Sequence, residues 1–237
     1  MRNLSLHLPE RIKEIGRNLL YLCRTKHEAE LAYWKKCFAK EGGFSNEHYR
    51  KLLLGMAGEA DDNFLADKRV ADFGCGPRGT LCWIGSTDTK IGIDVLTAKY
   101  LELFGSVMKQ HGMLYLSSTE TMIPLPDAFL DVLFTLNAFD HVANPDVMGS
   151  EFRRILKPGG ELIGSFNLNE PKTKAEPQCL QESWVRNHLL TGYEIISWRV
   201  TAKPTSGYLY QPLLDNKLLP VNNEPAILWV RAKKKNG

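Results

Sequence analysis

The chain alternates short apolar runs with amphipathic segments from residue 69 onward, and this alternation constrains its fold more than any other feature. Short runs rich in branched and aromatic residues predict buried strands, and the amphipathic segments between them predict crossover helices. Strands and helices that alternate in this way form a mostly parallel sheet with helices on both faces. The sequence therefore predicts a doubly wound α/β fold with strands near 69–73, 90–94, 113–117, 131–136, 160–166, 193–200 and 226–232, and helices near 79–86, 97–110, 146–156 and 179–190.

The first 66 residues have a different pattern. Apolar residues recur at helical spacing over residues 10–40, which predicts two amphipathic helices, and Ser45 is suited to cap a further helix that reaches about Gly55. We interpret residues 1–66 as a helical cap or lid and residues 67–237 as the main domain. Within that domain, four prolines between residues 201 and 225 predict a long loop.

Composition and charge exclude several classes of protein. The formal net charge is +3, and Arg231 with Lys233, Lys234 and Lys235 supplies +4, so the rest of the chain lacks the basic character of a nucleic-acid binder. No apolar run approaches the roughly 20 residues of a membrane helix, and the opening segment is too charged for a signal peptide. The five cysteines form no C-x-x-C pair. We therefore expect a cytoplasmic protein with reduced thiols and no metal site.

The segment DFGCGPRG, residues 72–79, follows the first predicted strand and contains the spacing G-x-G-x-x-G. Glycines at this point let the backbone approach a ligand closely, as in nicotinamide and S-adenosyl cofactor sites alike. Asp72 at the end of the strand would repel a pyrophosphate but attract an ammonium group. Asp94 ends the second strand and is placed to accept hydrogen bonds from ribose hydroxyls in either class of cofactor. The charge of Asp72 favours the S-adenosyl class.

Two segments further along the chain carry a more specific resemblance. IPLPDAFLDVLFTLNAFDHV (123–142) and EFRRILKPGGELIGSF (151–166) resemble the class I S-adenosylmethionine-dependent methyltransferases, especially the branch that acts on small molecules. The resemblance covers about residues 67–167. It implies a Rossmann-like seven-stranded sheet, S-adenosylmethionine as cofactor and a small-molecule acceptor. Arg78 stands where the family often has a third alternate glycine, and we expect its side chain to point to solvent.

The resemblance also implies a set of cofactor contacts. The first strand and its loop would face the methionine moiety, Asp94 the ribose, Val95 the adenine ring, the region after the third strand the adenine amino edge, and Asn137 the sulfonium. Aromatic residues of the N-terminal helices would form a lid. The expected cofactor-binding residues are Asp72, Gly74, Gly76, Asp94, Val95, Thr119, Glu120, Asn137 and Tyr49.

Two residues after the fourth strand are candidates for the chemistry. His141 is expected to act as a general base or to orient the acceptor, and Asp140 to contact the acceptor. The segment after the fourth predicted strand reads NAFDH, and not the [N/D]-P-P-[Y/F] of enzymes that methylate adenine or glutamine. No cysteine lies nearby to act as the nucleophile that cytosine carbon-5 methylation needs. Two alternatives stay open: a nicotinamide-dependent oxidoreductase, although no Tyr-x-x-x-Lys is present, and a non-catalytic cofactor-binding partner protein.

Overall fold

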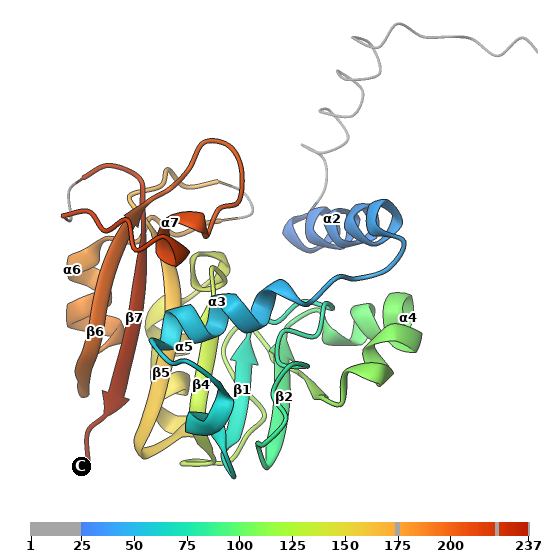
Figure 1. The fold of residues 1–237 in the computed structure, drawn as a ribbon, viewed down its shortest axis with the longest axis horizontal. Helices are drawn as coiled ribbons and strands as arrows, with labels where there is room; N and C mark the ends of the chain where they lie inside the picture. Colours follow the sequence, from blue (N-terminus) through green and yellow to red (C-terminus); the bar gives the residue numbers. More distant parts are fainter. Residues whose placement is uncertain (1–24, 174–175, 221–222, 237) are drawn as a thin grey trace, which may run out of the picture.

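The computed structural model describes residues 25–173, 176–220 and 223–236. A seven-stranded sheet forms its centre, in the order β3-β2-β1-β4-β5-β7-β6 (Figure 1). β7 is antiparallel to both β5 and β6, whereas the other neighbouring strands pair in parallel. The strands are β1 (Arg69–Phe73), β2 (Thr89–Asp94), β3 (Leu114–Ser117), β4 (Leu130–Leu136), β5 (Leu156–Leu168), β6 (Tyr193–Ala202) and β7 (Ala226–Lys234). The predicted doubly wound, mostly parallel sheet is therefore confirmed.

Helices cover both faces of the sheet. On one face, α3 (His48–Ala57) buries Leu52 and Leu53 in a cluster with Phe134 and Trp229 of the strands. On the opposite face, α5 (Pro145–Ile155) buries Phe152 in a cluster that extends along β1, β4 and β5. Figure 1 shows α3 in front of the sheet and α5 behind it. Successive side chains of a strand point to opposite faces of the sheet, and helices cover both faces. Most residues of β1 and β4 are therefore buried.

The N-terminal helix α2 (Lys26–Glu41) lies above the carboxyl ends of β1 and β2 (Figure 1). Its start is fixed by a capping box, in which the Thr25 hydroxyl accepts from the amide of Glu28 and the Glu28 carboxylate accepts from the amide of Thr25. Its end is fixed by Gly42, at φ 67°. The earlier part of the predicted helical region lies outside the described residues, and the division at residue 66 stays a prediction.

Helix α2 packs on α4 (Thr97–Met108), which follows β2. Phe38 of α2 and Phe104 of α4 have ring centroids 5.2 Å apart, and Phe44 lies 5.1 Å from Phe104. The hydroxyl of Tyr100 donates to Glu30 across the same contact at 3.0 Å. Short turns complete the fold: η1 (Asp62–Leu65), η2 (Lys109–His111), η3 (Phe139–His141) and α7 (Gln211–Leu214).

The predicted helix at 79–86 is wrong, because this segment forms consecutive turns. The amide of Cys82 donates to the carbonyl of Gly79, and the amide of Ile84 to that of Leu81, each three residues back. Gly79 adopts φ +78°, which is outside the helical region, and the Thr80 hydroxyl is drawn to Asp72. The connection from β1 to β2 therefore has no crossover helix.

Two other segments differ in part from prediction. The predicted helix at 179–190 shortens to α6 (Glu182–Trp184) followed by a π-helix, η4 (Val185–Leu189), because Leu180 forms a parallel bridge with Leu168. The predicted loop at 201–225 includes the end of β6, the short α7 and a bridge between Thr201 and Leu218.

Candidate active site

The carboxyl ends of β1, β2 and β4 border a cavity of about 670 Å³. Helices α2 and α3 form its other wall, through residues that include Glu30, Trp34 and Tyr49. This volume lies within the range of about 300–1,000 Å³ that small-molecule sites occupy. The position at the strand ends, next to β1, is where doubly wound sheets bind their ligands.

Asp72 lies in β1 at the floor of the cavity and is 2% exposed. One carboxylate oxygen, Oδ2, accepts from the Thr80 hydroxyl at 2.5 Å, and the other, Oδ1, has no partner among the described residues. Burial raises the pKa of Asp72 to about 7, an effect that the Thr80 hydrogen bond opposes and the charge of Asp94 reinforces. An unpartnered buried carboxylate of this kind fits a cationic ligand group.

Asp94 ends β2 and is held by two backbone amides. Its Oδ2 accepts from Gly76 at 3.1 Å and its Oδ1 from Leu96 at 2.8 Å. Burial and then the nearby charge of Glu30 raise the pKa of Asp94 to about 7, against those two amide bonds. Each oxygen keeps a further lone pair, so the braced carboxylate can also accept from hydroxyls of a ligand.

The glycine loop is packed closely on its neighbours. A Cβ on Gly74 would lie 2.1 Å from the Cβ of Ala138, and a Cβ on Gly76 would lie 2.7 Å from the ring of Trp34. Both glycines have positive φ, at 73° and 55°. The loop thus needs glycine at these positions for backbone conformation and for close contact with the turn after β4 and with α2.

The expectation that the Arg78 side chain points to solvent is wrong. Its guanidinium donates to the Glu41 carboxylate, at 2.7 Å through Nη1, and to the carbonyl of Ser45 at 2.9 Å. It also lies 5.5 Å and 5.4 Å from the ring centroids of Trp34 and Phe44. Only 12% of the side chain is exposed, because the residues between α2 and α3 fold over it. Arg78 therefore ties the glycine loop to the N-terminal helices.

Asn137 follows β4 and adopts φ 45°. Its side-chain oxygen accepts from the Ser165 hydroxyl at 2.8 Å, and its amide nitrogen donates to the hydroxyl of Tyr210 at 3.4 Å. Tyr210 comes from the 201–225 region and borders the cavity. This region and the N-terminal helices thus both contribute to the cavity wall.

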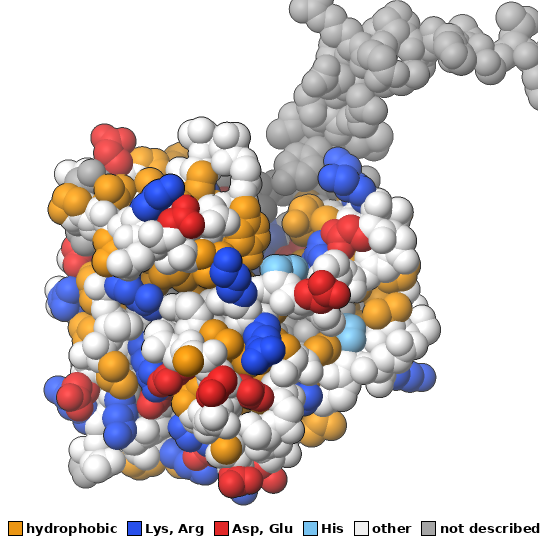
Figure 2. All heavy atoms as spheres, in the orientation of Figure 1, with side chains coloured by type: hydrophobic (Ala, Val, Ile, Leu, Met, Phe, Trp, Pro, Cys, Tyr) orange, Lys and Arg blue, Asp and Glu red, His pale blue; other side chains and the backbone are white. Residues whose placement is uncertain are grey.

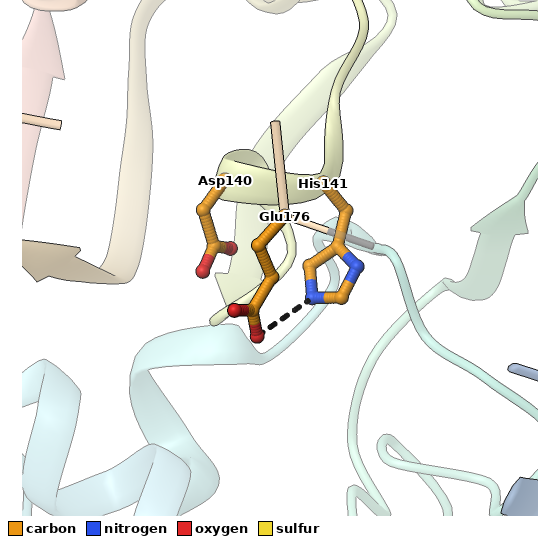
Figure 3. A group of neighbouring side chains, drawn as sticks. All are labelled: Asp140, His141 and Glu176. Atoms are coloured by element: carbon orange, nitrogen blue, oxygen red, sulfur yellow. Dashed lines mark ion pairs between the residues drawn. The ribbon is translucent and has the colours of Figure 1, made fainter. Parts of the chain in front are cut away.

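Asp140 and His141 lie side by side on η3, and Glu176 from the segment after β5 reaches between them (Figure 3). His141 Nε2 is 3.8 Å from Glu176 Oε1, and one ligand atom from each of the three residues lies within 4.8 Å of the others. Asp140 is 3% exposed, and burial raises its pKa while the neighbouring His141 opposes that rise. His141 and Glu176 border the cavity.

Most of the residues expected from the sequence surround this one cavity: Asp72, Gly74, Asp94, Val95, Thr119, Glu120, Asn137, His141 and Tyr49. Gly76 and Asp140 do not line the cavity themselves: the amide of Gly76 donates to Asp94, and Asp140 lies beside His141. What each of them binds stays a prediction.

The structure adds further cavity residues that the sequence analysis missed, namely Lys26, Glu30, His48, Thr80, Glu176 and Tyr210. Apart from Thr80, they come from segments without a motif, and only chain folding brings them to the site. A signal for Thr80 was present in the sequence, since a hydroxyl one residue after the last loop glycine is a suitable donor to Asp72.

Comparison with known proteins agrees with this geometry. Residues 71–164 match the family model described as a methyltransferase domain. No curated protein matches the sequence at a significant level. Among the residues that the structure describes, no helix is both long and apolar enough to cross a membrane.

Solved structures share the fold at low sequence identity. An S-adenosylmethionine-dependent methyltransferase from Thermotoga maritima has a TM-score of 0.58 at 16% identity, over 89% of this chain and 99% of that one. One from Mesorhizobium loti has a TM-score of 0.54 at 17% identity, over 72% and 92%. The [4+2]-cyclase SpnF has a TM-score of 0.56 at 16% identity, over 73% and 77%. At these identities the likeness shows the fold, which carries more than one chemistry.

Proposed function

We propose that this chain, which carries a class I S-adenosylmethionine-dependent methyltransferase domain, transfers a methyl group to a small-molecule acceptor with an oxygen or nitrogen nucleophile. When bound, the cofactor supplies a methyl group on a sulfonium, which is already activated for in-line displacement. The chain must then exclude water, hold the two reactants in line and accept or release a proton.

The buried carboxylate of Asp72 is the observation that carries this proposal. Its Oδ1 has no partner among the described residues, and it borders the cavity. A cationic ammonium compensates such a carboxylate, whereas a pyrophosphate would be repelled by it. The braced carboxylate of Asp94, at the end of the neighbouring strand, supplies an acceptor for ribose hydroxyls.

The residues after β4 supply the acceptor end of the cavity. Asn137 is fixed by Ser165 and Tyr210, so its position relative to the cofactor site is set by packing. His141, whose side chain is 33% exposed, is placed to touch an acceptor and to orient it or take its proton. Tyr49, Tyr210 and Trp34 add aromatic surface that excludes water.

The charges on one face of the molecule favour a small acceptor over a nucleic acid. On the face shown in Figure 2, basic and acidic side chains are interspersed. A nucleic-acid binder would concentrate Lys and Arg along one stripe or face.

Calorimetry followed by a transfer assay tests the proposal. We expect S-adenosylmethionine to bind, nicotinamide cofactors to give no heat, and tritiated methyl to pass to at least one compound of an acceptor panel. Binding of nicotinamide cofactors alone would favour the oxidoreductase alternative. Binding of S-adenosylmethionine without transfer to any acceptor would favour a non-catalytic partner protein.

A further inference from the structure

Three side chains with metal-binding atoms converge at the acceptor end of the cavity. Asp140 and His141 are adjacent on η3, and Glu176 comes from a segment that follows β5 (Figure 3). Their ligand atoms all lie within 4.8 Å of one another, and His141 Nε2 lies 3.8 Å from Glu176 Oε1. Two ligand atoms that each lie about 2.1 Å from a common ion, at right angles to one another, are about 3 Å apart. Small rotations of the three side chains would therefore bring their ligand atoms to bonding distance from one ion.

The charge of Asp140 points to a missing positive partner. Asp140 is 3% exposed, its Oδ2 accepts from Asn167 at 3.0 Å, and its Oδ1 has no hydrogen-bond partner among the described residues. Glu176 adds a second carboxylate. Lys26, which contacts this turn, donates instead to the carbonyl oxygen of His141 and lies 3.9 Å from Glu120. Buried carboxylates are normally paired or bound to a metal.

Backbone contacts hold the three residues together. The amide of Gln178 donates to the carbonyl of Asp140 at 3.3 Å, and the Gln178 side chain donates to the carbonyl of Val142 at 3.0 Å. Glu176 is fixed by reciprocal bonds with Thr173, each at 2.9 Å. The segment that carries Glu176 is therefore fastened to the turn that carries the other two, and the cluster is part of the fold.

We propose that Asp140, His141 and Glu176 bind a divalent cation that holds the nucleophilic oxygen of the methyl acceptor. One imidazole and two carboxylates suit first-row ions such as Mn²⁺, Fe²⁺ and Zn²⁺ better than a purely oxygen-binding ion. Three protein ligands leave positions open for the acceptor and water. The inference rests on the proposed methyl transfer and narrows its acceptor to one with an oxygen nucleophile.

Such an ion would serve the reaction as a Lewis acid. A hydroxyl bound to a divalent cation loses its proton more readily, and here that proton passes to solvent water. The oxygen's electron pair forms the new bond to the methyl carbon, while the pair of the broken S–CH₃ bond stays on sulfur, which becomes a thioether. His141 then acts on the acceptor as a ligand to the ion and not as a free base.

Titration of the full chain with Mn²⁺, followed by the electron paramagnetic resonance signal of the free ion, tests the site directly. After treatment with EDTA and desalting, we expect saturable binding of one Mn²⁺ per chain, which also raises Tm. Asp140→Asn and Glu176→Gln should each weaken that binding by about tenfold or more. Glu176 is 34% exposed on its side chain, so its variant should fold even where the buried Asp140 variant does not.

Asp146→Asn is the matched control. Asp146 Oδ1 lies 3.8 Å from His188 Nδ1, the same separation as in the proposed site, but this exposed pair has no third ligand within the described residues. We expect it to leave Mn²⁺ binding unchanged. No saturable binding by the wild-type chain, or equal binding by the Glu176→Gln and wild-type chains, would overturn the site.

Two further measurements separate this inference from the proposed function. Calorimetry with S-adenosylmethionine in EDTA tests cofactor binding without the ion, and we expect binding to persist. Methyl transfer in EDTA should fall by about tenfold or more and recover when Mn²⁺ is restored. A full transfer rate in EDTA would overturn the role of the ion and leave the methyltransferase proposal standing.

Discussion

The two ends of the cavity are built in different ways. At the proposed cofactor end, Asp72 and Asp94 lie at the carboxyl ends of two neighbouring parallel strands, and backbone amides and a nearby hydroxyl hold them. At the proposed acceptor end, Asn137 and His141 from the segment after β4 contact Tyr210 and Glu176, respectively, through their side chains, and these two partners come from two other loops. The first end is fixed by sheet geometry, whereas the second can change when a loop changes.

This difference explains why one fold accommodates several acceptors and chemistries. Parallel strands of a doubly wound sheet end at the same edge, so residues that terminate them meet wherever the fold forms. The loops that complete the site are subject to no such constraint. We therefore expect substitutions at the cofactor end to act on binding and substitutions at the acceptor end to act on turnover.

Gly76→Val should have the largest effect. Its Cβ would lie 2.7 Å from the Trp34 ring at a positive φ of 55°, so either the loop or helix α2 must move. We expect S-adenosylmethionine binding to be lost in calorimetry, while far-ultraviolet circular dichroism stays largely native. Gly105→Ala on α4 is the control, since nothing lies within 4 Å of its added Cβ. Retained cofactor binding would show that the loop does not form the binding site.

His141→Ala should lower the rate of methyl transfer by about 10² to 10⁴, because a group that positions or deprotonates the acceptor is lost. The Kd for S-adenosylmethionine should change by less than about threefold, since the proposed cofactor contacts of Asp72 and Asp94 do not involve His141. His188→Ala, at a histidine that stacks on Trp184, serves as control. A rate within about fivefold of wild type would remove His141 from the reaction, since positioned groups contribute more than that.

Asp94→Ala should weaken cofactor binding by on the order of 1.5 to 3 kcal/mol, or roughly 10- to 150-fold, through loss of a charged acceptor. The amides of Gly76 and Leu96 would also lose their partner. Asp88→Ala is the comparison, because Asp88 lies just before β2 and pairs only loosely with Arg69 at 3.7 Å. Unchanged affinity in calorimetry would exclude Asp94 from the site.

The smallest effect is a pH dependence at the cofactor end. Because the pKa of Asp72 is raised to about 7 in the ligand-free chain, protonation competes with a cationic ligand below that pH. We expect the Kd for S-adenosylmethionine to fall by about tenfold between pH 6 and pH 8. Asp72→Asn should bind more weakly and lose most of this slope. An equal pH dependence of the Kd in the Asp72→Asn variant would show that another group causes it.

The same carboxylates affect stability with the opposite sign. The pKa values of Asp72 and Asp94 rise from 3.8 to about 7 on folding, so the folded ligand-free chain holds more protons than the unfolded chain between these values. The contribution of this proton binding to the free energy of unfolding is fully present below about pH 4 and is lost as the pH rises through about 7. Urea unfolding of the ligand-free protein at pH 5 and pH 8 measures this loss, and Asp72→Asn should reduce it.

The sequence allowed the strands and two of the connecting helices to be predicted, since the helices expected at 97–110 and 146–156 correspond to α4 and α5. The connection from β1 to β2 was predicted wrongly. β1 was predicted with the bounds that the structure shows, because Val70, Ala71 and Phe73 form a short, mainly apolar run that is typical of a buried parallel strand. The helix expected at 79–86 failed because Gly79 and the bond from Thr80 to Asp72 outweigh local helical spacing. Arg78 was expected in solvent because its partner Glu41 lies 37 residues away in sequence.

What the sequence by itself determined is the strands of the mostly parallel sheet, the glycine loop and the carboxylates of Asp72 and Asp94 near the strand ends, since each depends on residues close together in the chain. Only the tertiary structure brought Glu176 to His141, Tyr210 to Asn137 and Trp34 to Gly76. These contacts join segments far apart in sequence, and their side chains carry no periodicity that marks the partner. The acceptor end of the cavity is therefore a property of chain packing, because no local pattern encodes which loops will meet.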